Sequence, residues 1–244
     1  VEISGNTIAV SVGSKHTCAL SDETPSSYTT SHTNTLYCWG DGESGKLGQG
    51  NEHDSTNPLE VTFSGELTPT SVSSGSDSTC LISSAEETYC WGDNDEYEIG
   101  RDGNTWANVP EEVQTPAGSV GVAVGGEFAC VLSDSGGNSA SVYCWGLEDD
   151  GQLGRDGNGL VSSTATLAGI LGSERDYDSD GVIAIMDSHH PGGQSGSTVI
   201  STKVASGGAH SCAIDASGDV SCWGFNAYGE LGNGVTVNPA GGVT

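Results

Sequence analysis

Basic residues are scarce in this chain of 244 residues, which has six Lys and Arg against 33 Asp and Glu and a formal net charge of −27. Phosphate groups are bound by clustered Lys and Arg, so nucleic acid is excluded as a partner. Docking on anionic lipid is excluded for the same reason. A solvated acidic surface accounts for this charge, and positively charged partners, divalent cations or a salty medium suit it.

Long apolar runs are also missing, so no insertion into a membrane is expected. The chain starts at Val1 rather than at Met, as a processed chain or a fragment would, and the lack of a leader does not argue against secretion. A helical periodicity appears only near residues 160–172. Glycine is abundant, with 38 residues, and an apolar content of only 34% predicts short strands joined by tight turns. The expected fold class is all-β.

A fourfold internal repeat organises the chain. Its four Cys-Trp-Gly motifs are spaced by 52, 54 and 78 residues, so the last interval holds an insertion of about 25 residues, within about 160–200. A period of this length is typical of β-propeller blades, which stack on their neighbours. We therefore expect one domain over 1–244, with antiparallel blades centred on 13–58, 75–110, 125–159 and 207–239.

Two cysteines in each repeat flank a predicted hairpin, with 19, 9, 13 and 9 residues between them. Facing cysteines across an antiparallel pair can form a disulfide, whereas the Cys-x2-4-Cys spacing of zinc sites is absent. The repeat selects one set of pairs among the many that eight cysteines allow: Cys18–Cys38, Cys80–Cys90, Cys130–Cys144 and Cys212–Cys222. Disulfides predict an oxidising compartment, so the protein is expected outside the cell or at its surface.

The first repeat reads Gly-x-x-His-x-Cys-Ala-Leu from Gly13, Tyr-Cys-Trp-Gly from Tyr37, Gly-x-Leu-Gly-x-Gly from Gly45, and then Asn57-Pro58. This order resembles the repeats of the regulator of chromosome condensation family, and the paired cysteines resemble its extracellular prokaryotic branch. The resemblance implies a β-propeller with blades of four antiparallel strands. It implies no single function, because members include a nuclear guanine-nucleotide exchange factor that also binds chromatin and a secreted inhibitor of β-lactamases.

Propellers of this family usually have seven blades, whereas this chain offers four repeats. The link from the Pro of one repeat to the first Gly of the next is 17 residues long from Pro58 to Gly75 and 15 residues long from Pro110 to Gly125. The residues after Pro239 and those up to Gly13 together number 18, which is about the length of one such link. The two ends thus complement each other. Either they close a four-blade ring within the chain, or they pair head to tail with another copy and make a ring or filament.

The insertion between the third and fourth Cys-Trp-Gly motifs contains a sequence similar to a twelve-residue calcium loop. Alternate carboxylates occupy positions 1, 3 and 5, Gly181 fits the sharp turn at position 6, and a backbone carbonyl and a final carboxylate complete the set. These expected Ca²⁺ ligands are Asp176, Asp178, Asp180, Val182 and Asp187. The expected dissociation constant is roughly 10⁻⁴–10⁻³ M. A chance match in an acidic surface loop is the alternative, and residues 163–171 are a candidate for a flanking helix.

No cluster of residues in the sequence predicts catalysis: a phosphate loop and a Gly-x-Ser-x-Gly elbow are absent, and carboxylate pairs are too numerous to be informative. The four motif tryptophans are expected in the core between blades, whereas Trp106 lies outside the motif as a contact residue or a satellite core residue. We therefore predict an extracellular, non-enzymatic, calcium-binding structural or adhesion scaffold that binds another protein or assembles with itself head to tail. The alternative is a secreted protein-binding or inhibitor propeller.

Overall fold

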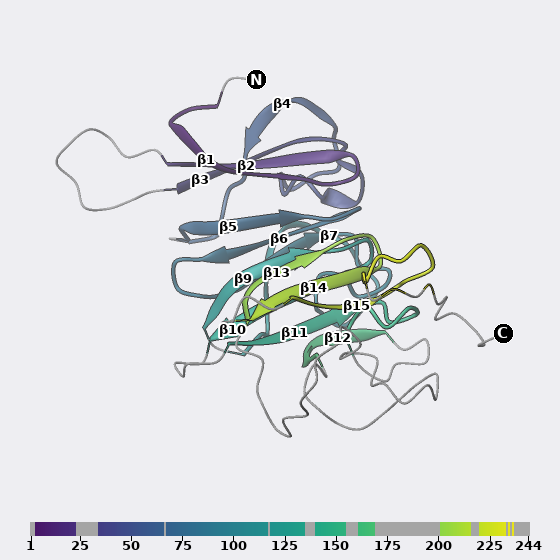
Figure 1. The fold of residues 1–244 in the computed structure, drawn as a ribbon. Coiled ribbons are helices and arrows are strands. Elements are labelled where there is room, and N and C mark those ends of the chain that lie inside the picture. Colours follow the sequence, from purple (N-terminus) through teal and green to yellow (C-terminus); the bar gives the residue numbers. More distant parts are fainter. Residues whose placement is uncertain are drawn as a thin grey trace.

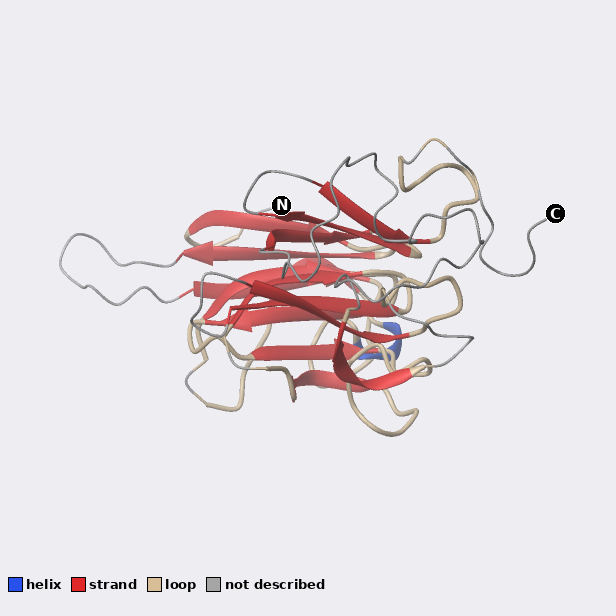
Figure 2. Cartoon of the chain, turned by 60° about the horizontal axis from the view of Figure 1, so that its bottom comes forward, coloured by secondary structure: helices blue, strands red, loops and turns tan. Residues whose placement is uncertain are grey.

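The structure is a computed structural model and describes residues 3–22, 34–65, 67–116, 118–134, 140–154, 161–168, 201–215, 220–232, 234 and 236. Within these residues the chain forms four antiparallel sheets and one short 3₁₀ helix, η1 (Glu43–Gly45). Figure 2 shows how strands dominate the molecule. No helix in the described part is long and apolar enough to cross a membrane. The predicted all-β fold of four antiparallel repeats is confirmed.

Each repeat builds one sheet in which consecutive strands are neighbours. The first sheet contains β1 (Asn6–Val12), β2 (His16–Asp22), β3 (Asn34–Gly40) and β4 (Ser55–Glu60), and the second contains β5 (Pro69–Ser74), β6 (Ser78–Ser83), β7 (Thr88–Gly92) and β8 (Ala107–Val113). The third sheet contains β9 (Ser119–Val124), β10 (Phe128–Asp134), β11 (Ala140–Gly146) and β12 (Ser162–Leu167). The described part of the fourth contains β13 (Ser201–Ser206), β14 (His210–Asp215) and β15 (Val220–Gly224).

The cysteines face each other in the register of the second and third strand of every sheet. Opposite positions in an antiparallel pair bring two Cβ atoms close enough for a disulfide. The structure forms the four predicted bonds, Cys18–Cys38, Cys80–Cys90, Cys130–Cys144 and Cys212–Cys222, and leaves no cysteine free. Each sheet is therefore stapled internally, and the disulfides do not join one sheet to another.

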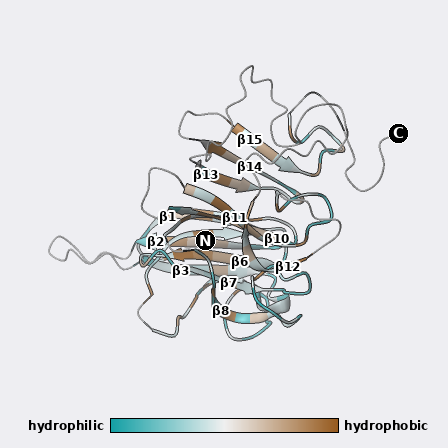
Figure 3. Ribbon diagram, turned by 90° about the horizontal axis from the view of Figure 1, so that it is seen from below, coloured by the Kyte–Doolittle hydropathy of each residue, from teal (hydrophilic) through white to brown (hydrophobic). Residues whose placement is uncertain are grey.

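The sheets pack on one another in chain order, as the purple-to-green sequence of colours in Figure 1 shows. The first strands β1, β5, β9 and β13 lie beside one another in succession, which is the arrangement of strands around a propeller axis. One apolar core fills the space among the first three sheets, and a second core joins the third sheet to the fourth. Figure 3 shows apolar segments on strands in the middle of a sheet, such as β6 and β14.

The expected helix over residues 163–171 is not formed where the structure describes this segment, because residues 162–167 are strand β12. Tyr143 and Cys144 of β11 pair with Leu167 and Thr166, and Ser162 pairs with Gly146. Pairing with the sheet outweighs a weak local periodicity, as is common for short segments rich in Thr and Ser. The strand belongs to the third blade, so the insertion begins after it.

Candidate functional site

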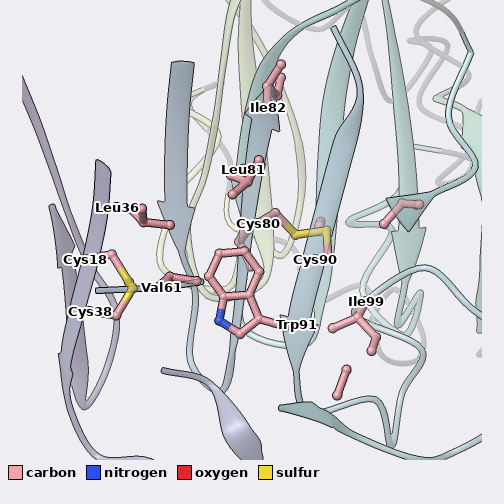
Figure 4. Close-up of a cluster of buried hydrophobic side chains, with 14 of the residues drawn as sticks. Cys18, Leu36, Cys38, Val61, Cys80, Leu81, Ile82, Cys90, Trp91 and Ile99 are labelled. Carbon is pink, nitrogen blue, oxygen red and sulfur yellow. A yellow bond between two sulfur atoms is a disulfide. The ribbon is translucent and has the colours of Figure 1, made fainter. Parts of the chain in front are cut away.

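The second, third and fourth sheets each dock on the preceding one through the tryptophan of the Cys-Trp-Gly motif. The indole Nε1 of Trp91 donates a hydrogen bond to the carbonyl oxygen of Lys46 at 2.9 Å. Trp145 makes the same bond to Glu98 at 2.8 Å, and Trp223 to Gln152 at 2.9 Å. All three indoles are buried, and Figure 4 shows Trp91 lying between the disulfides of the first two sheets. The prediction that these residues form inter-blade core is confirmed for these three.

The tryptophans are received by docking loops, which we define as residues 45–48, 97–100, 151–154 and 229–232. In the first three loops an apolar residue is buried: Leu47, Ile99 or Leu153. The final glycine of each loop has a φ near +70°, where other residues are strained. A Cβ at Gly48 or Gly100 would lie 3.0 Å from the indole nitrogen of the docked Trp. The Gly-x-Leu-Gly motif therefore shapes a groove for the next blade's indole.

Backbone hydrogen bonds add a second link between neighbouring sheets. Ser14 N–H donates to the carbonyl of Gly75 at 3.1 Å, Ser76 N–H to that of Gly125 at 3.3 Å, and Gly126 N–H to that of Gly208 at 2.9 Å. In each case the donor comes from the earlier blade and the acceptor from the later one. The donors occupy one repeat position, and the acceptors of the first two junctions also correspond, whereas the acceptor of the third lies one residue further along its repeat.

The second position of each docking loop differs in charge from blade to blade. In the first junction it is Lys46, whose buried ammonium donates to Asp41 at 2.8 Å and to Asp77 of the next blade at 2.7 Å. Burial opposes the charge, but these two hydrogen bonds outweigh it and raise the pKa of Lys46. The bond to Lys46 lowers the pKa of Asp41 in turn. One cation therefore bridges the carboxylates of two blades in this junction.

His16 shares the first junction. Its Nε2 lies 2.8 Å from the hydroxyl of Thr79, and the ring is buried. Burial, reinforced by the charge of Lys46, lowers the pKa of His16 to about 4. The ring is therefore neutral at physiological pH and joins two blades, as a structural histidine does.

The second junction carries Glu98 at the position of Lys46, while Asp93 and Glu127 take the positions of Asp41 and Asp77. Glu98 is only 3% exposed and accepts a hydrogen bond from the N–H of Glu96 at 3.0 Å. Burial, with added repulsion from Asp93 and Glu127, raises the pKa of Glu98 to about 7. Burial likewise raises the pKa values of Asp93 and Glu127.

These carboxylates line a recess of about 420 Å³ at one end of the second, third and fourth sheets. We call it the acidic recess, and its carboxylates are Asp77, Asp93, Glu98, Glu127 and Asp150. No group of His, Cys, Asp or Glu among the described residues has the geometry of a metal site. The recess is thus an electronegative hollow suited to a positively charged group rather than a preformed metal centre.

The predicted calcium ligands Asp176, Asp178, Asp180, Val182 and Asp187 lie outside the described residues. Trp106, left open between contact and core, is 44% exposed. The Lys46 and Glu98 clusters were not predicted from the sequence. Comparing the second position of the Gly-x-Leu-Gly motif across the repeats, which reads Lys, Glu, Gln and Glu, would have revealed them.

Comparisons with known proteins agree with this architecture. Models of the regulator of chromosome condensation (RCC1) repeat match residues 34–82, 87–132, 120–152 and 202–230, which together make more than half of the chain. The chain is 29% identical over 205 residues to the Homo sapiens E3 ubiquitin-protein ligase HERC2, a match that covers 82% of this chain and 4% of HERC2.

Two crystal structures share the fold. Human WBSCR16 superposes with a TM-score of 0.71 at 21% identity, covering 98% of this chain and 54% of the other. Prp20p from Saccharomyces cerevisiae, described with its binding properties to Gsp1p and histones, gives a TM-score of 0.68 at 17% identity, covering 98% and 50%. The chain thus spans about half the length of these propellers. The docking tryptophans, the glycine-shaped loops and the matched repeats place the chain in the regulator of chromosome condensation (RCC1) repeat family.

Proposed function

We propose that the protein is an extracellular, non-enzymatic scaffold that binds protein through the outer edges of its blade array. The observation that carries this proposal is the apolar first strand: Val10 and Val12 of β1 are 65% and 71% exposed, on the sheet face that is covered in the later blades. Exposed apolar stripes next to a built docking geometry are typical of protein interfaces. Protein binding is also in keeping with the relative Prp20p, which is described as binding Gsp1p and histones.

The proposed location rests on the cysteines. Four disulfides and no free thiol suit an oxidising compartment, and the acidic surface favours solubility there. A chain of this kind would belong to an extracellular, prokaryotic branch of the family. Its relatives in the family need not share this location, because the docking geometry does not depend on the disulfides.

The experiment is a crosslinking study on intact cells of the source organism with a membrane-impermeant reagent. We expect the protein to be labelled on whole cells, to resist thiol alkylation until it is reduced, and to crosslink to protein through lysines near the blade edges, such as Lys15. Labelling only after lysis would contradict the extracellular location. Labelling without any protein–protein crosslink would contradict the scaffold function.

Calcium binding is a separate part of the proposal and rests on the sequence of residues 176–187. Asp176, Asp178, Asp180, the carbonyl of Val182 and Asp187 would supply oxygen ligands to one Ca²⁺ ion. Calorimetric titration should give one site with a dissociation constant of roughly 10⁻⁴–10⁻³ M. The double variant Asp176→Asn/Asp180→Asn should abolish it, whereas Glu86→Gln, on an exposed turn of the second blade, should not. Equal heats for all three proteins would refute the site.

A second candidate function is that of a secreted inhibitor that reads a protein partner with its loop face. The acidic recess and the exposed Trp106 favour it, because an exposed aromatic residue and a hollow of one charge are typical of recognition surfaces. Alanine substitution of Trp106 would weaken binding to such a partner and leave assembly through the blade edges unchanged.

A further inference from the structure

The two outer edges of the blade array are the two halves of the junction that the chain forms three times internally. We call them the leading edge, on the first sheet, and the trailing edge, on the fourth. In the later blades, Ser74 and Val124 occupy the place of Val12 and are buried by the preceding sheet. Val12 and Val10 remain exposed, so the leading edge is an apolar surface of the kind that a preceding blade covers.

The tryptophan of the leading edge, Trp39, differs from the other three in its surroundings. Trp39 is partly exposed, and its Nε1 has no hydrogen-bond partner in the described part of the chain, whereas Trp91, Trp145 and Trp223 are buried and bonded. The carbonyl of Gly13, which corresponds to the acceptors Gly75 and Gly125, likewise receives no N–H from another described blade. The leading edge therefore lacks a docking loop and a backbone donor.

The trailing edge offers a docking loop and a backbone donor. Its docking loop keeps the conformation of the other three: Asn226 accepts from the N–H of Leu231 at 3.0 Å, and Gly232 has a φ of +68°. Leu231 is partly exposed, unlike Leu47, Ile99 and Leu153, which are buried. No described atom lies within 4 Å of a Cβ built at Gly232, where the other loops hold an indole. Gly208 supplies an N–H that makes no hydrogen bond within the described residues.

The charges of the two edges are complementary. The trailing loop carries Glu230 at the position of Lys46, and the leading edge carries Lys15 at the position of Asp77. The pair Lys46–Asp77 of the first junction would thus recur with its signs exchanged. The chain has only six Lys and Arg among 244 residues, so a cation at this one position is a specific feature rather than the background.

We propose that the leading edge of one copy docks on the trailing edge of a second copy. In this contact Trp39 Nε1 donates to the carbonyl of Glu230, Gly208 N–H donates to the carbonyl of Gly13, and Lys15 pairs with the carboxylate of Glu230. Val10 and Val12 pack on the fourth sheet. The inference rests on the proposed scaffold function, because it names the partner that the blade edges bind.

The complementary charges and backbone groups of the two edges favour a second copy of this chain as the occupant. Within the described residues, no strand of the first sheet packs extensively on the fourth sheet. Two copies joined at both ends would supply roughly eight blades, at the upper end of the range of about four to eight found in propellers. A head-to-tail contact that closes in this way gives a discrete ring of two chains.

The test uses charge reversal in the full chain. Lys15→Glu places two carboxylates in the contact, and Glu230→Lys places two ammonium groups there. Each variant alone should pair at least about tenfold more weakly than the wild type, since like charges at an interface cost several kcal/mol. An equimolar mixture of the two variants restores an opposite-charge pair at both contacts of a two-chain ring. Native mass spectrometry and sedimentation should therefore show heterodimers, with an affinity within about threefold of the wild type.

Glu86→Lys, which changes the net charge as Glu230→Lys does but lies on an exposed turn of the second blade, should assemble normally. Trp39→Ala should also weaken pairing, and near-ultraviolet circular dichroism will show whether each variant is folded. Oligomers whose mass grows with concentration, and which respond to the same substitutions, would support the same contact in an open chain of copies.

A wild type that stays monomeric at all concentrations would overturn the inference. So would folded single variants that remain monomeric on mixing, the result expected if the edges close within one chain. If crosslinking on cells still captures a different protein, the proposed scaffold function stands and only self-pairing fails. If it captures none, both fail.

Discussion

The first and second junctions use one backbone geometry and opposite charges. In both, a buried indole donates to a loop carbonyl, at 2.9 Å from Trp91 and 2.8 Å from Trp145. The residue that provides this carbonyl is a lysine held between two carboxylates in the first junction and a glutamate beside two more carboxylates in the second. The repeat therefore fixes how blades dock, while one variable position sets whether the junction attracts or repels.

The third junction has uncharged residues at the positions that carry Lys46 and Asp77 in the first junction. Gln152 stands at the variable position, and Ala209 stands opposite it where the first junction has Asp77. The indole of Trp223 still docks at 2.9 Å, so the geometry does not require either charge. Substitutions at Lys46 and Glu98 can accordingly be made without removing the docked indole that all three junctions share.

Loss of the shared anchor should have the largest effect. Trp91→Ala and Trp145→Ala each remove a fully buried ring and leave a cavity, so the free energy of unfolding should fall by about 3–5 kcal/mol in either junction. Urea denaturation at neutral pH would measure it. The matched control is Trp39→Ala in dilute, monomeric protein, which should lose less than half as much because Trp39 is already partly exposed. Equal losses at all three positions would show that docking is not the source of the stability.

Removing the cation should convert the first junction into one like the second. Lys46→Met keeps much of the buried stem but leaves Asp77 without its hydrogen-bonded cation, and leaves Asp41 with only the exposed Lys15, whose ammonium is 3.9 Å away. The free energy of unfolding should fall by about 3 kcal/mol, the usual cost of breaking a buried pair from one side. Denaturation of dilute protein would measure this loss. Lys15→Met, which removes a lysine that is 63% exposed, should change stability by no more than about 0.5 kcal/mol; similar losses would contradict the role of Lys46.

The second junction should be stabilised by acid. The pKa of Glu98 is raised to about 7 in the folded protein, so the folded state holds a proton that the unfolded state has lost above about pH 4.5. The stabilisation from this bound proton is complete below about pH 4.5 and disappears as the pH rises through 7. Between pH 5 and 8 the wild type should lose roughly 2–3 kcal/mol more than Glu98→Gln does. Denaturation of both proteins across this range would measure the difference.

His16 changes the stability with pH in the opposite direction. Its pKa is lowered to about 4, so the stability that the neutral ring contributes is lost as the pH falls below about 6.5. Subtracting the stability curve of Glu98→Gln from that of the wild type removes the contribution of His16, since both proteins retain this residue. Asp93 and Glu127 face Glu98 and also have raised pKa values, so part of their response changes with Glu98. Parallel stability curves for the two proteins would disprove the raised pKa of Glu98.

The repeat made most of the fold predictable. Cys, Trp and Gly recur at fixed positions because each has one physical task, and those tasks give the hairpin pairing, the disulfides and the docked indoles directly from sequence. Strand β12 was not predictable, because its Thr and Ser residues carry little periodicity and its place is decided by pairing with β11. The weak helical pattern of the same residues led to the wrong expectation.

The candidate site was harder to predict than the fold. In a chain with 33 acidic residues, carboxylates lie close together everywhere in sequence, and only the packing of blades shows that Asp93, Glu98 and Glu127 meet. Link lengths suggested that the two ends complement each other but could not distinguish closure within one chain from pairing between copies. That distinction depends on how far each blade rotates from the last, which is a property of the packed sheets.

The smallest effect should come from a serine hydrogen bond that both junctions share. Ser11 Oγ accepts from the N–H of Ser74 at 2.8 Å, and Ser73 Oγ accepts from the N–H of Val124 at 3.0 Å. Ser11→Ala and Ser73→Ala should each cost about 1 kcal/mol and speed hydrogen exchange at the amide that loses its acceptor. Ser14→Ala, which removes only an exposed hydroxyl contact to Ser76, should cost less. A larger loss for Ser73 than for Ser11 would mean that the repulsive junction depends more on its neutral hydrogen bonds than the junction that Lys46 holds together.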